Sequence, residues 1–385
     1  MLKSNKVVIF FDFYLQFLIF SIINRSFVPF NIDLRYIVVF LAFIAILVSL
    51  FSNQEFKINK NIVLILALYF FIIIGFFNQK TINVDKQVYL NLIILNLYCF
   101  FNILVLSYFS SYIKINNVWK YITYAWYFLF FSVIVSAIGW DLPFNDYKGS
   151  YISSAEVGSG IRFSGYGTDP NYVCIIAIIL IILTHTLKKS KKVKIPIYIM
   201  ATLVIILTRS RTALVIALIL FCMSIVDKFM TTEIKILVIG IIFICLALVP
   251  ILMLVIKPFN NNISMALRYD LWEQAFHAFL KHPILGNGLM AGRNLAFYNL
   301  NWFVQSHSTY FQLLCDNGII ALFLYFLIFF TNVIKNINNP LKYIFLIYFA
   351  WSFSYETMYL TYTILFLGIF PYCTVNFKGD SKQYE

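Results

Sequence analysis

Residues 188–226, KKSKKVKIPIYIMATLVIILTRSRTALVIALILFCMSIV, determine how the rest of the chain is interpreted. Two apolar runs, 195–208 and 212–226, are separated by a short polar turn and preceded by a cluster of lysines. We interpret the runs as two short membrane-spanning helices joined by that turn. Clustered lysines mark the cytoplasmic side of a membrane protein, so the loop at 188–194 is predicted to be cytoplasmic.

The rest of the chain has the same apolar character. It contains 385 residues, of which 62% are hydrophobic and only 12% are charged, whereas a soluble domain averages about 25% charged residues. Apolar runs that cross or nearly cross a bilayer occur at 7–23, 36–51, 61–77, 88–109, 118–139, 171–187, 195–208, 212–226, 236–256, 309–333, 341–355 and 357–375. The sequence therefore predicts an all-α, polytopic integral membrane protein of about twelve transmembrane helices, with residues 1–385 as one membrane domain.

The distribution of cations orients this domain. With the loop at 188–194 inside, both termini are expected to be cytoplasmic, and two long loops, 140–169 and 257–308, are expected outside. The cytoplasmic cations are then lysines, and the external cations include every arginine: Arg25, Arg35, Arg162, Arg209, Arg211, Arg268 and Arg293. If 195–226 instead formed one broken helix, the second long loop would lie inside. The net charge of +13 is attributed to topology and to anionic lipid or substrate rather than to nucleic acid.

The external arginines suggest an anion-binding face, because a guanidinium offers a planar fork of donors that fits phosphate and carboxylate. Arg209 and Arg211 lie in the turn TRSRTA (208–213) between two short runs. They either extend to the outer head groups or face inward and bind an anion. Arg162, in GIRFSGYGTDPNYV (160–173), is a candidate substrate contact, with a solvated surface arginine as the alternative. In the same segment Asp169, followed by Pro170, predicts the N-cap of the next helix.

The second long loop contains an amphipathic pattern, SMALRYDLWEQAFHAFLK (264–281). At 100° per residue Arg268 lies in the middle of the apolar stripe, whereas His277 lies on the opposite, polar arc. An interfacial helix here would expose His277 to water and direct Arg268 toward the protein or the membrane interior. Arg268 then needs an anionic partner.

His307 is the candidate general base. It lies in SHSTYFQLL (306–314), where Ser308 is a predicted N-cap for the helix that follows. The positive end of a helix dipole favours the neutral imidazole, which can accept a proton. A satisfied histidine at the membrane interface is the alternative interpretation.

Several kinds of chemistry have no signature in this sequence. We find no P-loop, no Asp-x-Asp pair suited to a metal-bound nucleotide sugar, and no His/Cys cluster. The six cysteines have no paired spacing in loops, so neither disulfides nor a metal site is predicted. We expect no cofactor, and cytosolic nucleotide chemistry is disfavoured.

At this point the pattern resembles the superfamily of O-antigen polymerases and O-antigen ligases. The resemblance rests on four segments in order: RFSGYGTDPNY (162–172), SRTA (210–213), Arg268 and Trp272 followed by HPILGNG (282–288), and SHSTYFQLL with a later Gly318. It covers about residues 162–330. The segment GYGTDPNY looks more like that of a polymerase than that of a ligase.

The resemblance implies metal-independent, inverting transfer of an oligosaccharide from undecaprenyl diphosphate to an acceptor hydroxyl at the external face of the cytoplasmic membrane. Arg211 and Arg268 would bind the diphosphate, with Arg209 and Arg162 as weaker candidates, and His307 would deprotonate the acceptor. The product would be O-antigen, capsule or exopolysaccharide. Lipid-linked oligosaccharide would serve as donor and acceptor, and flippase and chain-length regulator proteins would be partners.

Two alternatives stay open. A ligase would pass finished glycan to a lipid A core instead of joining repeat units. A flippase for lipid-linked oligosaccharide belongs to another class and usually has two related halves and charges deep within its spans. In this sequence the halves look unrelated, and Asp12 is the only acid well inside an apolar run.

Overall fold

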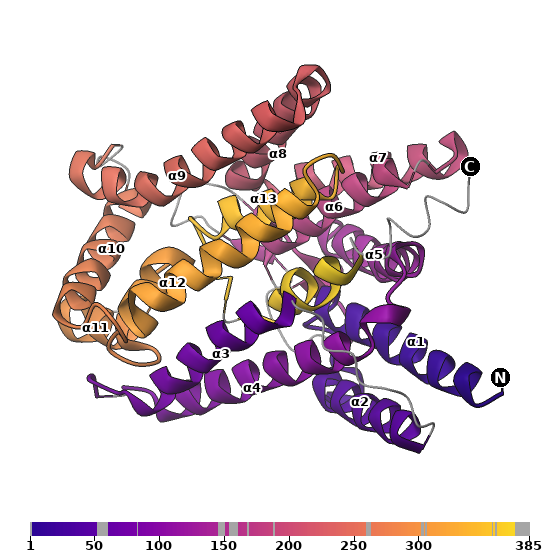
Figure 1. Cartoon of the computed structure of the whole chain (residues 1–385), viewed down its shortest axis with the longest axis horizontal. Coiled ribbons are helices and arrows are strands. Elements are labelled where there is room, and N and C mark those ends of the chain that lie inside the picture. The colour runs from indigo at the N-terminus through magenta and orange to yellow at the C-terminus, as the bar shows by residue number, and fades with distance from the viewer. Residues whose placement is uncertain are drawn as a thin grey trace.

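The computed structural model describes residues 2–51, 61–82, 84–144, 151–153, 161–167, 169–187, 189–258, 263–301, 304, 306–355, 357–358 and 360–373 (Figure 1). Its helices are α1 (Leu2–Ile23), α2 (Leu34–Phe51), α3 (Asn61–Phe77), α4 (Lys86–Tyr108), α5 (Ile115–Ala137), α6 (Pro170–Thr186), α7 (Lys191–Thr208), α8 (Arg211–Val226), α9 (Thr232–Ile256), α10 (Ile263–Lys281), α11 (Ala291–Leu300), α12 (Thr309–Lys335) and α13 (Lys342–Trp351). A π-helical segment, η6 (Ile364–Ile369), follows.

Six of the described helices are long and apolar enough to cross a membrane: α1, α2, α4, α5, α9 and α12. Shorter apolar helices lie at 62–77, 170–186, 342–351 and 364–373. In α9 only 17% of the most apolar stretch is buried, so most of its side chains face the surroundings of the bundle. In a helix this apolar, that surface is suited to lipid. The structure therefore confirms a mostly helical, multi-pass membrane protein, while the count of twelve spans stays a prediction.

The apolar core forms where helices from both halves of the chain pack together. It includes Leu18 of α1, Trp126 of α5, Leu180 of α6, Tyr325 of α12 and Phe349 of α13, each fully buried. Because α1 and α13 share this core, the chain folds around one centre rather than as two separate halves.

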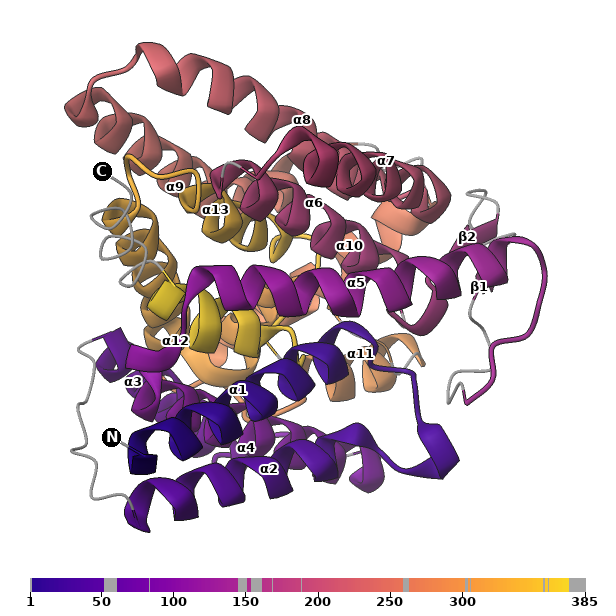
Figure 2. The same ribbon diagram turned by 90° about the vertical axis from the view of Figure 1, so that its right-hand side faces the viewer.

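The connections at one end of the bundle, which we call the arginine end, comprise the described residues within 24–33, 78–85, 138–169, 209–210, 282–308 and 352–363. Backbone hydrogen bonds join them across long sequence separations: Ser26 N–H donates to the Tyr166 carbonyl at 3.0 Å, and Lys80 N–H donates to the Asn287 carbonyl at 2.9 Å. In Figure 2 the start of α1 lies on the left and the two strands lie on the right, on the side of the arginine end.

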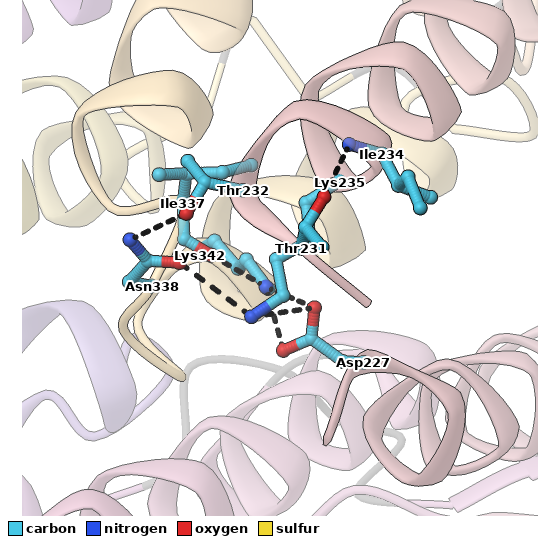
Figure 3. Close-up of polar contacts among 8 residues, drawn as sticks. All are labelled: Asp227, Thr231, Thr232, Ile234, Lys235, Ile337, Asn338 and Lys342. Carbon is cyan, nitrogen blue, oxygen red and sulfur yellow. Dashed lines mark hydrogen bonds and ion pairs between the residues drawn. The ribbon is translucent and has the colours of Figure 1, made fainter. Parts of the chain in front are cut away.

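The opposite end, which we call the lysine end, contains the described residues within 109–114, 187–190, 227–231 and 336–341. Lys189 Nζ donates to Asn116 Oδ1 at 3.1 Å. The Lys342 side chain is 2% exposed, and its Nζ contacts the Asp227 carboxylate at 2.7 Å, with Lys235 at 3.7 Å from the same carboxylate. Figure 3 shows both ammonium groups directed toward the Asp227 carboxylate. This ion pair ties the α8–α9 connection to the α12–α13 connection.

These contacts decide between the two interpretations of residues 195–226. α7 ends at Thr208 and α8 begins at Arg211, and the turn between them lies at the arginine end, where Ser210 Oγ donates to Asn171 Oδ1 at 2.6 Å. α8 then ends beside Asp227 at the lysine end. Residues 195–226 therefore form two helices that return through a turn, and the alternative of one broken helix is wrong.

α12 is interrupted at Gly318, whose φ of 79° and ψ of −175° fit a glycine and few other residues. Segment 282–290, which we call the clasp, packs against this break. Ile319 N–H donates to the Pro283 carbonyl at 2.9 Å, and Gly288 N–H donates to the Asp316 carbonyl at 2.9 Å. The Asp316 carboxylate accepts from Gly292 N–H at 3.2 Å. The HPILGNG motif thus holds α10, α11 and α12 together (Figure 1).

Two features differ from the sequence prediction. Strands β1 (Tyr151–Ser153) and β2 (Ile161–Phe163) pair antiparallel, with Ile152 opposite Arg162, where we expected only a loop. The run 357–375 is not one helix, because regular structure begins only near η6. Lys188, and parts of both long loops predicted at 140–169 and 257–308, lie outside the described residues.

Candidate functional site

Arg268 is carried by α10 on the face that packs against the protein. Leu271, Trp272 and Ala275 are at most 4% exposed, whereas the His277 side chain on the opposite face is 67% exposed. The amphipathic orientation predicted for this helix is therefore confirmed, with protein rather than lipid covering much of the apolar stripe. The sequence places Arg268 one helical turn before Trp272, so both side chains lie on one side of α10.

The positive charge of Arg268 is poorly compensated in this position. Nη1 donates one long hydrogen bond, at 3.5 Å, to the Ser354 carbonyl, and no carboxylate pairs with the guanidinium within the part of the chain that the structure describes. Burial lowers the pKa of Arg268, and the nearby Tyr355 acts in the opposite direction. A guanidinium stays protonated at any physiological pH, so Arg268 is a half-buried cation that lacks an anionic partner among the described residues.

His307 lies directly before α12 and is fixed by its neighbours. Trp272 Nε1 donates to the Ser306 carbonyl at 2.7 Å, so the residue before His307 is bonded to the helix that carries Arg268. His307 itself has a φ of 52°, a left-handed conformation that is uncommon for a residue other than glycine. Such strain is often found at functional sites.

Ser308 is the N-cap residue of α12, as predicted. Its side chain makes no capping hydrogen bond, however, and its buried hydroxyl has no hydrogen-bond partner among the residues that the structure describes. The first amide of the helix is satisfied by backbone instead, because Thr309 N–H donates to the carbonyls of Ser352 and Tyr355 at 2.8 and 2.9 Å. The Ser308 hydroxyl beside His307 is therefore available to a bound ligand.

Asn171 is the centre of a polar network at the start of α6. Its Oδ1 accepts from Arg162 Nη2 at 2.8 Å and from Ser210 Oγ at 2.6 Å, and its Nδ2 donates to the Tyr355 hydroxyl. The predicted N-cap is confirmed, since Asp169 Oδ1 accepts from Asn171 N–H at 2.7 Å. One amide side chain thus joins the first long loop, the α7–α8 turn and the segment after α13.

Arg162 has a structural role that the sequence did not reveal. Its Nε donates to the Thr208 carbonyl at 2.8 Å, while its Nη2 binds Asn171. The first interaction fixes β2 against the C-terminal end of α7, where free carbonyls favour a cation, and the second fixes β2 against the start of α6. Arg162 therefore holds the site together, whether or not it also contacts substrate.

Tyr355 interacts electrostatically with two half-buried arginines, Arg162 and Arg268. Burial raises the pKa of its hydroxyl, Asp169 adds to the increase, and Arg268 and Arg162 oppose it. Its carbonyl accepts from Thr309 Oγ1 at 2.6 Å, so Tyr355 is also tied to the start of α12. Nothing in the sequence singled out Tyr355, because its partners are distant in the chain, whereas Asn171 lies within the quoted motif GTDPNY.

Arg209 and Arg211 flank the buried Ser210 and are both exposed. Arg209 ends α7 in the left-handed conformation, with a φ of 47°. Within the described residues neither guanidinium makes a hydrogen bond or an ion pair. The structure thus brings Arg162 and Arg268 together around Tyr355. His307 lies two residues before Thr309, whose N–H donates to the Tyr355 carbonyl. Arg209 and Arg211 lie at the surface of the same end.

Fold and site together describe a multi-pass membrane protein with a cationic, aromatic-lined centre at one end of its bundle. Residues 195–326, about a third of the chain, match the family model described as O-antigen ligase. This match confirms the resemblance to the superfamily of O-antigen ligases and polymerases. It includes Arg209, Arg211, Arg268 and His307 and excludes Arg162 and Tyr355. A comparison with curated proteins finds no significant match.

Proposed function

We propose that the protein is a membrane glycosyltransferase that polymerises oligosaccharide repeat units carried on undecaprenyl diphosphate. One observation carries the proposal: Arg268 is a half-buried cation with a single long hydrogen bond, to Ser354, and without a carboxylate partner in the described part of the chain. A diphosphate supplies the charge that such a site lacks. The family match of residues 195–326 supports the same class of substrate.

In the proposed reaction a hydroxyl oxygen of the acceptor glycan attacks the anomeric carbon of the donor sugar. The new glycosidic bond forms as the bond from that carbon to the diphosphate oxygen breaks, and the bonding electrons stay on the diphosphate. His307 takes the proton of the acceptor hydroxyl. Arg268 and Arg211 neutralise the charge that develops on the departing diphosphate, with Arg209 as a further cation. Attack from the opposite face inverts the anomeric configuration.

The proposal includes a membrane orientation. The arginine end faces outward, the lysine end and both termini are cytoplasmic, and twelve spans cross the cytoplasmic membrane. The separation of lysines from arginines supports this orientation. A cysteine at Tyr298, which is 51% exposed, should react with an impermeant maleimide in intact cells, in a background without the exposed Cys222 and Cys245. Asn338→Cys, at the lysine end, should react only after permeabilisation; the opposite labelling pattern would reverse the orientation and refute the mechanism.

The decisive assay uses purified protein and a defined lipid-linked repeat unit. The wild type should release undecaprenyl diphosphate and produce a ladder of longer glycans, whereas His307→Ala should produce only single repeats. His277→Ala is the matched control, because His277 is exposed and its nearest charged partner, Glu273, lies 3.9 Å away. Full polymer output from His307→Ala would refute a catalytic base at this position and favour a transporter.

A ligase is the second candidate, because the matching family model is described as O-antigen ligase. Deletion of the gene separates the two activities in cells. Loss of a polymerase collapses the glycan ladder to single repeats, whereas loss of a ligase leaves full-length polymer on the lipid carrier. Accumulation of that polymer would replace the polymerase assignment with the ligase assignment.

A further inference from the structure

A second cationic site lies away from the centre around Tyr355. A groove of about 580 Å³ runs between α2 and α4, two helices that lie side by side in Figures 1 and 2. Its polar lining comprises Arg25, Asp33, Arg35 and Asn91. Its apolar lining comprises Tyr36, Val39, Phe43, Val88, Leu92, Ile94, Leu95, Leu97, Tyr98 and Phe101. The groove is thus polar at one end and apolar along its length.

The polar end carries one cation in excess. Asp33 binds Arg35 through its Nε at 2.7 Å. Burial alone would raise the pKa of Asp33, but the hydrogen bonds from Arg35 and the charges of Arg35 and Arg25 lower it overall, so the carboxylate stays ionised. Arg25 makes no hydrogen bond or ion pair among the described residues. It is therefore the free cation at the mouth of the groove, next to a neutralised pair.

The apolar part extends from that mouth toward the lysine end. The rings of Phe43 in α2 and Phe101 in α4 lie 5.4 Å apart, and farther along both helices Ser49 hydrogen-bonds Tyr108. Because the residue numbers rise together, α2 and α4 run parallel. The lining residues of α4 extend over about 20 Å at 1.5 Å per residue. Phe43 and Ile94 are 54% and 60% exposed. A hydrocarbon chain lying in this groove would cover them while its head group stayed at Arg25.

The groove is also connected to the centre described above. Tyr362 interacts electrostatically with both Arg25 and Asp169, and its ring stacks on Tyr172 with centroids 4.8 Å apart. The Tyr172 ring in turn packs edge-on against the Tyr355 ring, with centroids 5.8 Å apart. A row of aromatic rings therefore links the mouth of the groove with the residues around Arg268.

We propose that the α2–α4 groove binds the polyprenyl diphosphate of a second lipid-linked glycan. The inference rests on the proposed function, because joining two lipid-linked chains requires both carriers to be bound at once. Arg268 would hold the departing diphosphate of the donor, and Arg25 would hold the diphosphate of the acceptor, which stays intact. The aromatic row, in which Tyr172 and Tyr362 are buried, would lie between the two head groups and hold the two sites at a fixed separation.

Native mass spectrometry with undecaprenyl diphosphate tests the groove directly. The wild-type protein should bind two molecules, and Arg25→Gln and Arg268→Gln should each bind one. The affinity of the lost site should fall about tenfold or more, since a charge-assisted contact is removed. Lys86→Gln is the matched control, because Lys86 begins α4, is exposed and does not line the groove. Ile94→Trp fills the groove without changing its charge. Like Arg25→Gln, this variant should therefore bind only the undecaprenyl diphosphate at Arg268.

Each contrary result has a separate meaning. Two bound molecules in both Arg25→Gln and Ile94→Trp would refute the groove. If phosphatidylglycerol competed for the groove as well as undecaprenyl diphosphate does, the groove would be a site for ordinary anionic lipid, and the inference would also be overturned. Polymer assays on the same samples separate this failure from that of the function: a wild type that makes polymer with an unaffected Arg25→Gln refutes only the groove, whereas a wild type that makes none refutes the proposed function.

Discussion

Trp272 Nε1 donates a hydrogen bond to the carbonyl oxygen of Ser306 at 2.7 Å, and this bond joins the helix of Arg268 to the segment of His307. Both residues are buried, and the Trp272 ring stacks on Phe311 with centroids 5.3 Å apart. The indole N–H thus directly joins the helix of the cation to the segment of the base in the proposed site, in addition to the contacts of the clasp.

Trp272→Phe removes that N–H and keeps an aromatic ring. We expect kcat to fall about tenfold or more with little change in KM, because small displacements of reacting groups are costly. Trp126→Phe is the control, since the Trp126 indole is equally buried but has no hydrogen-bond partner. Equal kinetics for the two variants would show that the Trp272 bond does not position His307.

Arg268→Gln should separate activity from stability. Loss of the guanidinium should reduce turnover by about 100-fold or more. The thermal unfolding temperature should stay constant or rise, because an uncompensated half-buried charge is removed. Lys281→Gln, at the exposed end of the same helix, should change neither quantity. A marked fall in unfolding temperature for Arg268→Gln would identify Arg268 as a structural residue instead.

Asn171→Ala removes a hydrogen-bond partner that three polar groups share: Arg162 Nη2, Ser210 Oγ and the Tyr355 hydroxyl. Each unsatisfied buried group costs about 1–3 kcal/mol, so the variant should unfold at a clearly lower temperature and lose activity. Asn299→Ala, which removes an exposed amide bonded to Gln274 at 3.3 Å, is the control. Similar unfolding temperatures for both variants would argue against a central role for Asn171.

Gly318→Ala should destabilise the protein by at least about 1–3 kcal/mol, because its backbone conformation strains any side chain. An added Cβ would also collide with the Ile284 carbonyl. Gly240→Ala is the matched control, since Gly240 lies within α9 with open space around it, and alanine there should be neutral or stabilise by about 0.5–1 kcal/mol. Thermal unfolding of purified protein measures both effects; equal stability would mean that the break in α12 is not required.

Regular features of this chain were predictable because they follow local rules. Apolar runs predict helices wherever the chain must satisfy its backbone in lipid. The stripe around Arg268 was predicted because helical periodicity alone places Leu271 and Trp272 beside it. The Asp169 cap depends on the next two residues only, and it formed as expected.

The polar contacts of the site were not predictable in the same way. Asn171 and Tyr355 are 184 positions apart, and no periodicity relates such distant residues. The Ser308 hydroxyl makes no capping hydrogen bond for a related reason: the carbonyls of Ser352 and Tyr355 already accept from the Thr309 amide. Tertiary contacts replaced a local interaction that the sequence favours.

The break at Gly318 separates two mechanical tasks within α12. Residues 309–317 are fixed by the clasp and by Tyr355, whereas residues 319–335 form about 26 Å of helix at 1.5 Å per residue. Helices adapt to hydrocarbon layers of different thickness mainly by tilting. Because α12 is broken at Gly318, a tilt of residues 319–335 is not transmitted along one continuous helix to the residues beside His307. We therefore expect the geometry of the site to depend little on the thickness of the surrounding bilayer.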